Sequence, residues 1–142
     1  MVDSSKSLTL NEQKEALAKS FIKALKEHDW DLLRSIITDS VIWELPGNNL
    51  LSGKTVGIEA VLSLAKQIVS FGVSLELENI LIGNNGFALA IHNRAERNGY
   101  VLNEHLATVC IIQEEKIAKI NTYLSDIDGM DSFFVPDNKT TL

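Results

Sequence analysis

Two residues near the middle of the chain, Asn98 and Gly99, constrain the fold more than any other feature. They separate two apolar stretches, 87–97 and 100–113, and an Asn-Gly pair in that position is the strongest short signal for a β-hairpin with a two-residue turn. Such a turn also fixes the register, because residues whose numbers add up to the same sum as 98 and 99 lie opposite one another. The sequence therefore predicts a long antiparallel hairpin with defined cross-strand neighbours.

Three ionisable residues, His92, Arg94 and Glu96, stand at every second position of the first of these strands. Because side chains alternate between the two faces of a strand, all three share one face. If that face looks into a cavity, the row is a candidate site. If it looks at solvent, the row is a solvated strand end with a weak Arg94–Glu96 ion pair. The opposite face begins apolar and ends polar, so alternation leaves both interpretations open.

The hairpin register adds a second histidine to this row. It places His105 opposite His92 and Asn103 opposite Arg94, with facing Cβ atoms about 5 Å apart. Histidine titrates near neutral pH, so a facing pair is a candidate proton relay or ligand contact, and the alternative is a hydrogen-bonded pair in the core or on the surface. Two histidines alone are too few to hold a metal ion, so we expect no metal. No cofactor is expected either.

The first half of the chain has the signals of helices. Thr9 and Glu12 fit a capping box, and the apolar residues behind them recur at helical spacing. Asp29 can cap a second, short helix. Residues 48–54 are polar or contain glycine and are typical of a loop. The expected elements are a helix at 10–27, a short helix at 30–37, a strand at 40–45 and a helix at about 57–71.

The second half predicts only strands, at 73–82, 87–97, 100–113 and 116–125, joined by successive hairpins. Helices that precede an antiparallel meander indicate an α+β domain, in which a cone-shaped, curved antiparallel sheet packs against three helices of the N-terminal half. We expect one domain at 9–134, a frayed N-terminus at 1–8 and a flexible tail at 135–142. The hollow of such a cone is where a small ligand would bind.

Composition narrows the possible partners. The chain has 142 residues, of which 45% are hydrophobic and 23% charged, as in ordinary single globular domains. Its formal net charge of -6 argues against nucleic acid or an anionic membrane as a partner. The polar N-terminus lacks the apolar core of a signal peptide, and the apolar runs are too short to span a bilayer, so a cytoplasmic location is expected. Cys110 lies in an apolar strand and is best interpreted as a small hydrophobe.

Four short motifs accompany this order of elements: Asp29-Trp30-Asp31-Leu32-Leu33, Trp43-Glu44-Leu45-Pro46-Gly47, Gly53-Lys54, and Lys116-Ile117 leading to Tyr123-Leu124-Ser125-Asp126. Together they resemble the nuclear transport factor 2-like superfamily over residues 10–134. Within it the chain is most similar to SnoaL-like proteins, which are relatives of ketosteroid isomerase, polyketide cyclases and limonene epoxide hydrolase. This superfamily hosts several chemistries as well as non-catalytic binding domains, so the resemblance is specific for fold and not for function.

The resemblance implies a pocket between sheet and helices, with an aspartate at the end of the last strand pointing into it. Asp126 stands at that position. Arg94, Glu96 and Asp126 also resemble the Arg-x-Asp and second Asp of limonene epoxide hydrolase, with Glu in place of the middle Asp. A SnoaL-type cyclase needs one acid/base carboxylate, a role that Asp126 could fill. The alternative is a turn residue or helix cap, because residues 125–129 are turn-rich.

The leading hypothesis is a small-molecule enzyme that performs acid/base chemistry of isomerase, cyclase or hydrolase type on an oxygenated, largely apolar substrate. Its expected catalytic residues are Asp126, Arg94 and His92, and its expected substrate contacts are His105, Glu96, Trp43 and Asn103. The alternative is a non-catalytic domain of the same fold that binds a small molecule or another protein. The resemblance also implies a homodimer through the outer face of the sheet, where Tyr123 is expected.

Overall fold

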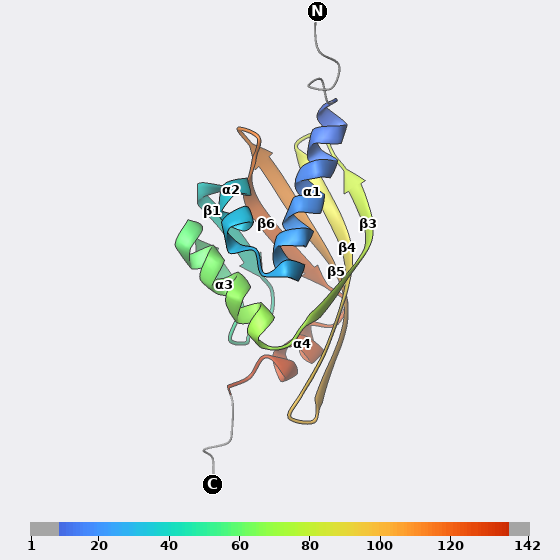
Figure 1. Ribbon diagram of the computed structural model, residues 1–142. Helices are drawn as coiled ribbons and strands as arrows, with labels where there is room; N and C mark the ends of the chain where they lie inside the picture. Colours follow the sequence, from blue (N-terminus) through green and yellow to red (C-terminus); the bar gives the residue numbers. More distant parts are fainter. Residues whose placement is uncertain (1–8, 137–142) are drawn as a thin grey trace, which may run out of the picture.

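The polypeptide forms one open sheet whose inner face is covered by helices (Figure 1). A computed structural model describes residues 9–136; the predicted frayed segment 1–8 and most of the predicted tail lie outside the described residues. The elements are α1 (Leu10–Glu27), α2 (Trp30–Ile36), β1 (Ile37–Leu45), β2 (Gly53–Val56), α3 (Ile58–Ser70), β3 (Ser74–Ile82), β4 (Gly86–Arg97), β5 (Tyr100–Gln113), β6 (Lys116–Leu124) and α4 (Ile127–Phe133). The α+β class predicted from the sequence is confirmed.

The sheet is mixed, with the strand order β2-β1-β6-β5-β4-β3. Neighbouring strands are antiparallel except β1 and β6, which run parallel. This corrects the expected all-antiparallel sheet, because periodicity along β1 identifies a strand without saying which edge of the meander it joins. The expected loop at 48–54 is also corrected at its end, since β2 pairs with β1 there.

Local signals place the helices where the sequence predicts them. The capping box is present, with Thr9 Oγ1 accepting from the Glu12 N–H and Glu12 Oε1 accepting from the Thr9 N–H, both at 3.0 Å. These hydrogen bonds lower the pKa of the Glu12 carboxyl. Asp29 caps α2 by accepting from the Leu32 N–H at 3.1 Å. Phe21 of α1 packs against Trp43 with ring centroids 6.0 Å apart, which joins the helical layer to the concave face of the sheet.

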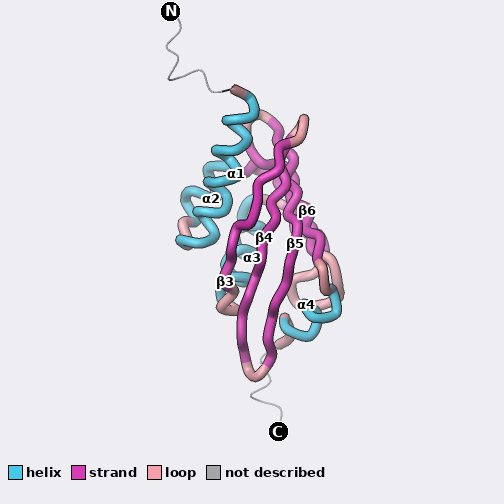
Figure 2. The backbone as a smooth tube through the Cα atoms, turned by 90° about the vertical axis from the view of Figure 1, so that its right-hand side faces the viewer, coloured by secondary structure: helices cyan, strands magenta, loops and turns pink. Residues whose placement is uncertain are grey.

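The β4–β5 hairpin runs the length of the molecule (Figure 2). Its turn residues have positive φ angles, 53° at Asn98 and 83° at Gly99, as a two-residue turn of this kind requires. The register is the predicted one, with His92 opposite His105 and Asn103 opposite Arg94. The turn chemistry therefore determines which side chains meet across these two strands.

At the other end of β4, near Gly86, the backbones of β4 and β5 approach one another closely. A Cβ atom on Gly86 would lie 1.8 Å from the backbone oxygen of Cys110, so only glycine fits there. The Cys110 side chain is fully buried, and this burial raises the pKa of its thiol. Leu89 is also fully buried. The core under this part of the sheet is therefore tightly packed.

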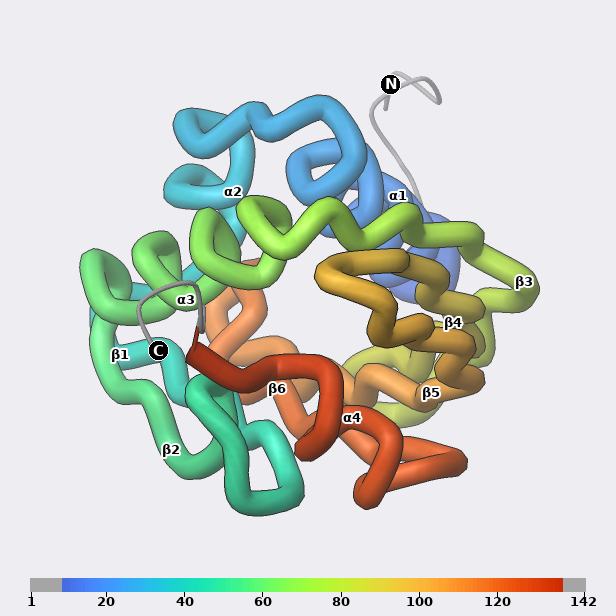
Figure 3. The backbone as a smooth tube through the Cα atoms, turned by 90° about the horizontal axis from the view of Figure 1, so that it is seen from below, coloured from blue at the N-terminus to red at the C-terminus, as the bar shows by residue number. Residues whose placement is uncertain are grey.

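The chain closes with α4, a helix that the sequence did not predict. It lies at the same end of the molecule as the Asn98–Gly99 turn, opposite the end where α1 begins (Figure 3). Phe133 and Phe134 at its end pack on Phe71, with ring centroids 6.3 and 5.0 Å away. Among residues 9–136, no helix has both the length and the apolar character needed to cross a membrane.

Candidate functional site

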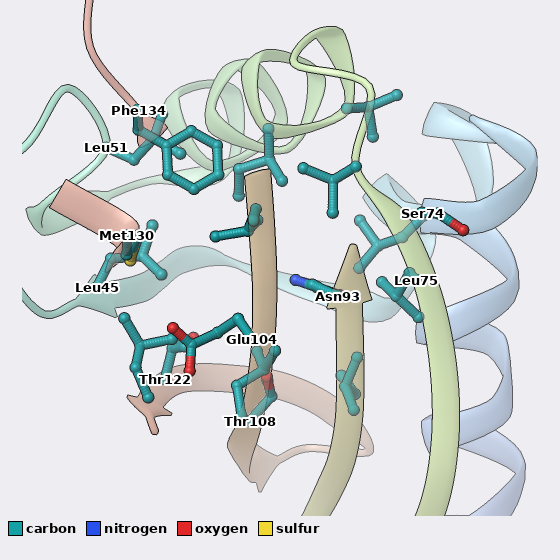
Figure 4. Close-up of a pocket in the computed structure, with 18 of the residues that line it drawn as sticks. Leu45, Leu51, Ser74, Leu75, Asn93, Glu104, Thr108, Thr122, Met130 and Phe134 are labelled. Atoms are coloured by element: carbon teal, nitrogen blue, oxygen red, sulfur yellow. The ribbon is translucent and has the colours of Figure 1, made fainter. Parts of the chain in front are cut away.

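A cavity of about 240 Å³ lies between the concave face of the sheet and the helices (Figure 4). This is just below the range of about 300–1,000 Å³ typical of ligand pockets, so it suits a small ligand. Its walls are mostly apolar and include Phe21, Leu25, Trp43, Leu45, Leu51, Ile68, Ile91, Leu102, Leu106, Met130 and Phe134. Lys26 and His28 lie at the C-terminal end of α1, where they are exposed at the rim of the cavity.

One carboxylate lies in this apolar cavity, that of Glu104 on β5. Its side chain is only 2% exposed. One oxygen, Oε2, accepts from the Ser125 N–H at 2.7 Å, from the Asp126 N–H at 2.9 Å and from the Ser125 hydroxyl. The other oxygen, Oε1, is buried and makes no hydrogen bond within the described residues. A buried acceptor without a partner is costly, so Oε1 is suited to receive a hydrogen from a bound molecule.

The residue facing Glu104 across the hairpin is Asn93. Its amide nitrogen points into the cavity (Figure 4), while its Oδ1 atom is buried and also has no hydrogen-bond partner among the described residues. An acceptor on Glu104 and a donor on Asn93 thus stand on adjacent strands in the same apolar chamber. Preorganised polar groups of this kind orient a ligand, and they can stabilise charge that develops on it.

Two threonines complete the polar part of the wall. Thr122 of β6 is buried and accepts a hydrogen bond from Trp43 Nε1 at 3.1 Å. Thr108 of β5 lies opposite Thr122 and is also buried. Trp43 therefore lies in the cavity wall with its indole held in place, at the position the sequence suggested for it; its contact with a substrate stays a prediction.

The row of His92, Arg94 and Glu96 lies on the other side of the sheet. The bulky residues Phe87, Leu89 and Ile91 occupy the odd positions of β4 and are buried toward the helices. Strand alternation then turns the even positions outward. The structure thus corrects the inward interpretation.

These outward residues do come together. His92, Arg94, Glu96 and Asn103 line an open depression on the outer face, and Val101 lies beside them. Arg94 and Glu96 are exposed there. The proposed substrate contacts Asn103 and Glu96 are thus separated from the cavity by the sheet itself.

His92 and His105 form a stacked pair on this outer face. Their ring centroids are 4.0 Å apart and their planes differ by 19°. His92 is 7% exposed, and its Nε2 atom contacts Asn103 Oδ1. His105 is exposed, and its Nδ1 atom lies 3.4 Å from Oε1 of Glu78. The predicted pairing is therefore present, but it cannot reach a ligand in the cavity.

Asp126 does not line the cavity either. It is exposed and caps α4, with its Oδ1 atom accepting from the Gly129 N–H at 2.9 Å. The alternative of a turn residue or helix cap therefore describes its side chain, because the strand ends at Leu124, before Asp126 could point inward. Its backbone N–H still serves the cavity by holding Glu104.

Sequence reasoning overlooked Glu104 and Asn93, although a signal for both was present. The hairpin register that pairs His92 with His105 also pairs Asn93 with Glu104. The odd positions of β4 carry large apolar residues while Ala88 and Ala90 are small, which favours the odd positions as the inner face. Taken together, these two observations place the Asn93 amide and the Glu104 carboxylate on the inner face of the sheet.

The chain matches no family model, and no curated protein matches it significantly. Solved structures do match. Bal32a, from a soil-derived mobile gene cassette, has a TM-score of 0.83 and 20% identity over 87% of this chain and 98% of its own. A cystatin-like protein from Xanthomonas campestris has a TM-score of 0.80 and 24% identity over 87% and 98%. An epoxide hydrolase of the limonene epoxide hydrolase-like type from Mycobacterium tuberculosis has a TM-score of 0.69 and 12% identity over 89% of this chain and 92% of its own.

These similarities, together with others to nuclear transport factor 2-like structures, confirm the fold predicted from the sequence. The chain has the nuclear transport factor 2-like, or cystatin-like, α+β architecture. At such low identities the neighbours share the fold and not necessarily the chemistry, so function is argued from the cavity itself. The homodimer and the cytoplasmic location stay predictions.

Proposed function

We propose that the protein is a small-molecule enzyme of SnoaL-like type, in which Glu104 transfers protons to or from an oxygenated, largely apolar substrate. One observation carries this proposal: among residues 9–136, Glu104 supplies the only carboxylate of the cavity wall, and its buried Oε1 atom has no hydrogen-bond partner there. An acid/base group must be within hydrogen-bond reach of the proton that it moves. Oε1 of Glu104 meets that condition for a molecule held against the apolar walls.

The reaction that this arrangement suits best is proton transfer next to a carbonyl group. Glu104 would remove a proton from the carbon beside the carbonyl, and the electron pair of that bond would move onto the carbonyl oxygen as an enolate. The Asn93 amide would donate a hydrogen bond to this oxygen and stabilise its charge. Where a carbon–carbon double bond is conjugated with the enolate, return of the proton from Glu104 to the far carbon completes an isomerisation. Attack of the enolate carbon on a second carbonyl of the same substrate forms an alkoxide, and transfer of the proton from Glu104 to that alkoxide completes a cyclisation.

The epoxide-hydrolase chemistry has less support. It would need Arg94, Glu96 and Asp126 around one substrate, but the first two lie on the outer face and the third caps α4. The non-catalytic alternative is favoured by a different observation, that three donors from the turn before α4 converge on Glu104 Oε2. In that case Glu104 anchors the turn, and the cavity binds a ligand without changing it.

A deuterium-exchange experiment tests the proposal without knowledge of the natural substrate. Small apolar ketones and diketones are incubated with the protein in D₂O, and exchange at the carbon next to the carbonyl is followed by NMR. We expect catalysed exchange with at least one of them. The Glu104→Gln variant should lower its rate by about 100-fold or more, because general-base catalysis contributes on the order of 10²–10⁴.

Matched controls identify the responsible carboxylate. Asp126→Asn keeps a good helix cap and the backbone N–H that holds Glu104, and Glu96→Gln alters only the outer face. Both variants should exchange at the wild-type rate. A loss of exchange in Asp126→Asn with full activity in Glu104→Gln would return the acid/base role to Asp126. Thermal stabilisation by the ketones without any exchange would support the non-catalytic alternative instead.

A further inference from the structure

We propose that Glu78, His92 and His105 form a binding site for a divalent transition-metal ion on the outer face of the sheet. The three residues come from three adjacent strands, β3, β4 and β5. One carboxylate oxygen and one ring nitrogen from each histidine lie within 4.8 Å of one another. Two imidazoles and a carboxylate are a donor set that binds Zn²⁺ and its neighbours in the periodic table, rather than Mg²⁺ or Ca²⁺.

The distances are close to those of a bound site. Zn²⁺ with bonds of about 2.0–2.1 Å holds tetrahedral ligands about 3.3 Å apart. Glu78 Oε1 and His105 Nδ1 are already 3.4 Å apart. The two imidazole rings are stacked with centroids 4.0 Å apart, which keeps both histidines next to the Glu78 carboxylate.

A β-bulge brings the carboxylate to this place. Leu77 lies opposite Ile91 and Asn79 lies opposite Ala90, so Glu78 is the extra residue between two regular pairs. Bulges of this kind redirect a side chain, and here the Glu78 carboxylate reaches His105, which is two strands away. The sequence alone could not reveal the third ligand, because strand numbering does not show the bulge.

His92 is held as a metal-binding histidine usually is. Its side chain is buried, and its Nε2 atom contacts Asn103 Oδ1. In the neutral tautomer that donates from Nε2 to this oxygen, Nδ1 keeps the lone pair that a metal ion would bind. Metal-bound histidines commonly donate their second ring N–H to a neighbouring acceptor, which fixes the ring and its tautomer.

The surrounding charges also bear on a cation. Glu76 lies opposite His92 on β3 and adds negative charge, while Arg94 stands two residues farther along β4 and opposes it. The protein as a whole carries a net charge of -6. His105 and Glu78 are exposed, so an ion can enter directly from solvent and keep one coordination position for water.

Calorimetric titration of the untagged, chelator-treated protein with ZnCl₂ tests this proposal. We expect one ion per chain, because the three ligand atoms form a single group. His105→Ala and Glu78→Gln should each weaken binding by at least about 10-fold, since the loss of one ligand removes a coordinate bond. Circular dichroism would verify that these exposed substitutions leave the fold intact.

His28 provides the matched control. It is the one other histidine of the chain, and it ends α1 with φ 56°, a conformation that asparagine tolerates. His28→Asn should bind Zn²⁺ as the wild type does, and so should Glu104→Gln, because this proposal does not depend on the cavity. Unchanged Zn²⁺ affinity in His105→Ala, or no binding by the wild type, would overturn the site.

Discussion

The two faces of the β4–β5 hairpin differ in how many polar residues they carry and in the surroundings of those residues. The outer face presents several ionisable groups, among them His92, Arg94 and Glu96, along an open depression. The inner face presents Asn93 and Glu104 in a wall that is otherwise mainly apolar. Both faces are built from the same two strands and the same register, so the difference arises only from which side the helices cover.

That difference shows how much environment decides the effect of a charge. Solvent screens the charges on the outer face, and pairs such as Glu78 with His105 contribute little to stability by themselves. On the inner face the effective dielectric constant is lower, so each polar contact is stronger and each missing partner is more costly. The buried carboxylate of Glu104 can therefore have a larger effect on ligand binding or catalysis than the outer row of His92, Arg94 and Glu96.

Truncation of one apolar residue on each face should give the largest contrast. Leu89 is fully buried beneath the helices, whereas Val101 is 67% exposed on β5. Leu89→Ala should lower the free energy of unfolding by about 3 kcal/mol, because it removes buried methyl groups and leaves a cavity. Val101→Ala should cost less than about 1 kcal/mol. Urea denaturation measures both, and equal losses would mean that the two faces are not packed differently.

Removal of the hydrogen bonds that Glu104 accepts should have a smaller effect on the free energy of unfolding. Glu104→Leu removes the acceptor for the Asp126 N–H and the Ser125 hydroxyl, and should lower the free energy of unfolding by about 2 kcal/mol. Glu104→Gln keeps an acceptor oxygen and should cost less than about 1 kcal/mol. Glu96→Leu, on the outer face, is the control and should change stability little. A Glu104→Leu variant as stable as the wild type would show that the turn does not depend on this carboxylate.

Much of the fold could be predicted because its signals are local. The helix caps at Thr9 and Asp29 and the Asn98–Gly99 turn each act within a few residues. The parallel pairing of β1 with β6 could not be predicted, because it joins segments far apart in the sequence. The helix α4 was missed for a related reason: its seven residues contain Gly129, and the helix is stabilised by Phe133 packing on Phe71.

The candidate site was predicted less well, and the cause is physical. Composition makes a row of charges such as His92, Arg94 and Glu96 conspicuous, yet conspicuous charges are usually solvated. The inner pair, Asn93 and Glu104, consists of single polar residues in otherwise apolar surroundings, and it becomes visible only when register and strand direction are considered together. The direction itself depends on helices that are distant in the sequence.

The smallest expected difference between the inner and outer faces concerns the two arginines of β4, Arg94 and Arg97. Arg97 is half-buried on the inner side, with its guanidinium carbon 4.4 Å from the centre of the Phe71 ring. Its Nη1 atom also donates to the backbone oxygen of Val135 at 3.1 Å. Arg94, three residues earlier, is exposed on the outer face.

Arg97→Ala should therefore lower the free energy of unfolding by about 1 kcal/mol, because it removes a cation–π contact and a hydrogen bond that tie the hairpin to the segment after α4. Arg97→Lys should recover part of this loss, since lysine keeps the charge without the planar group. Arg94→Ala should change stability by less than about 0.5 kcal/mol. Thermal unfolding should show a decrease of about 3–4 °C for Arg97→Ala alone. If Arg94→Ala lowered the melting temperature equally, side-chain charge rather than the inner or outer position would govern this end of the hairpin.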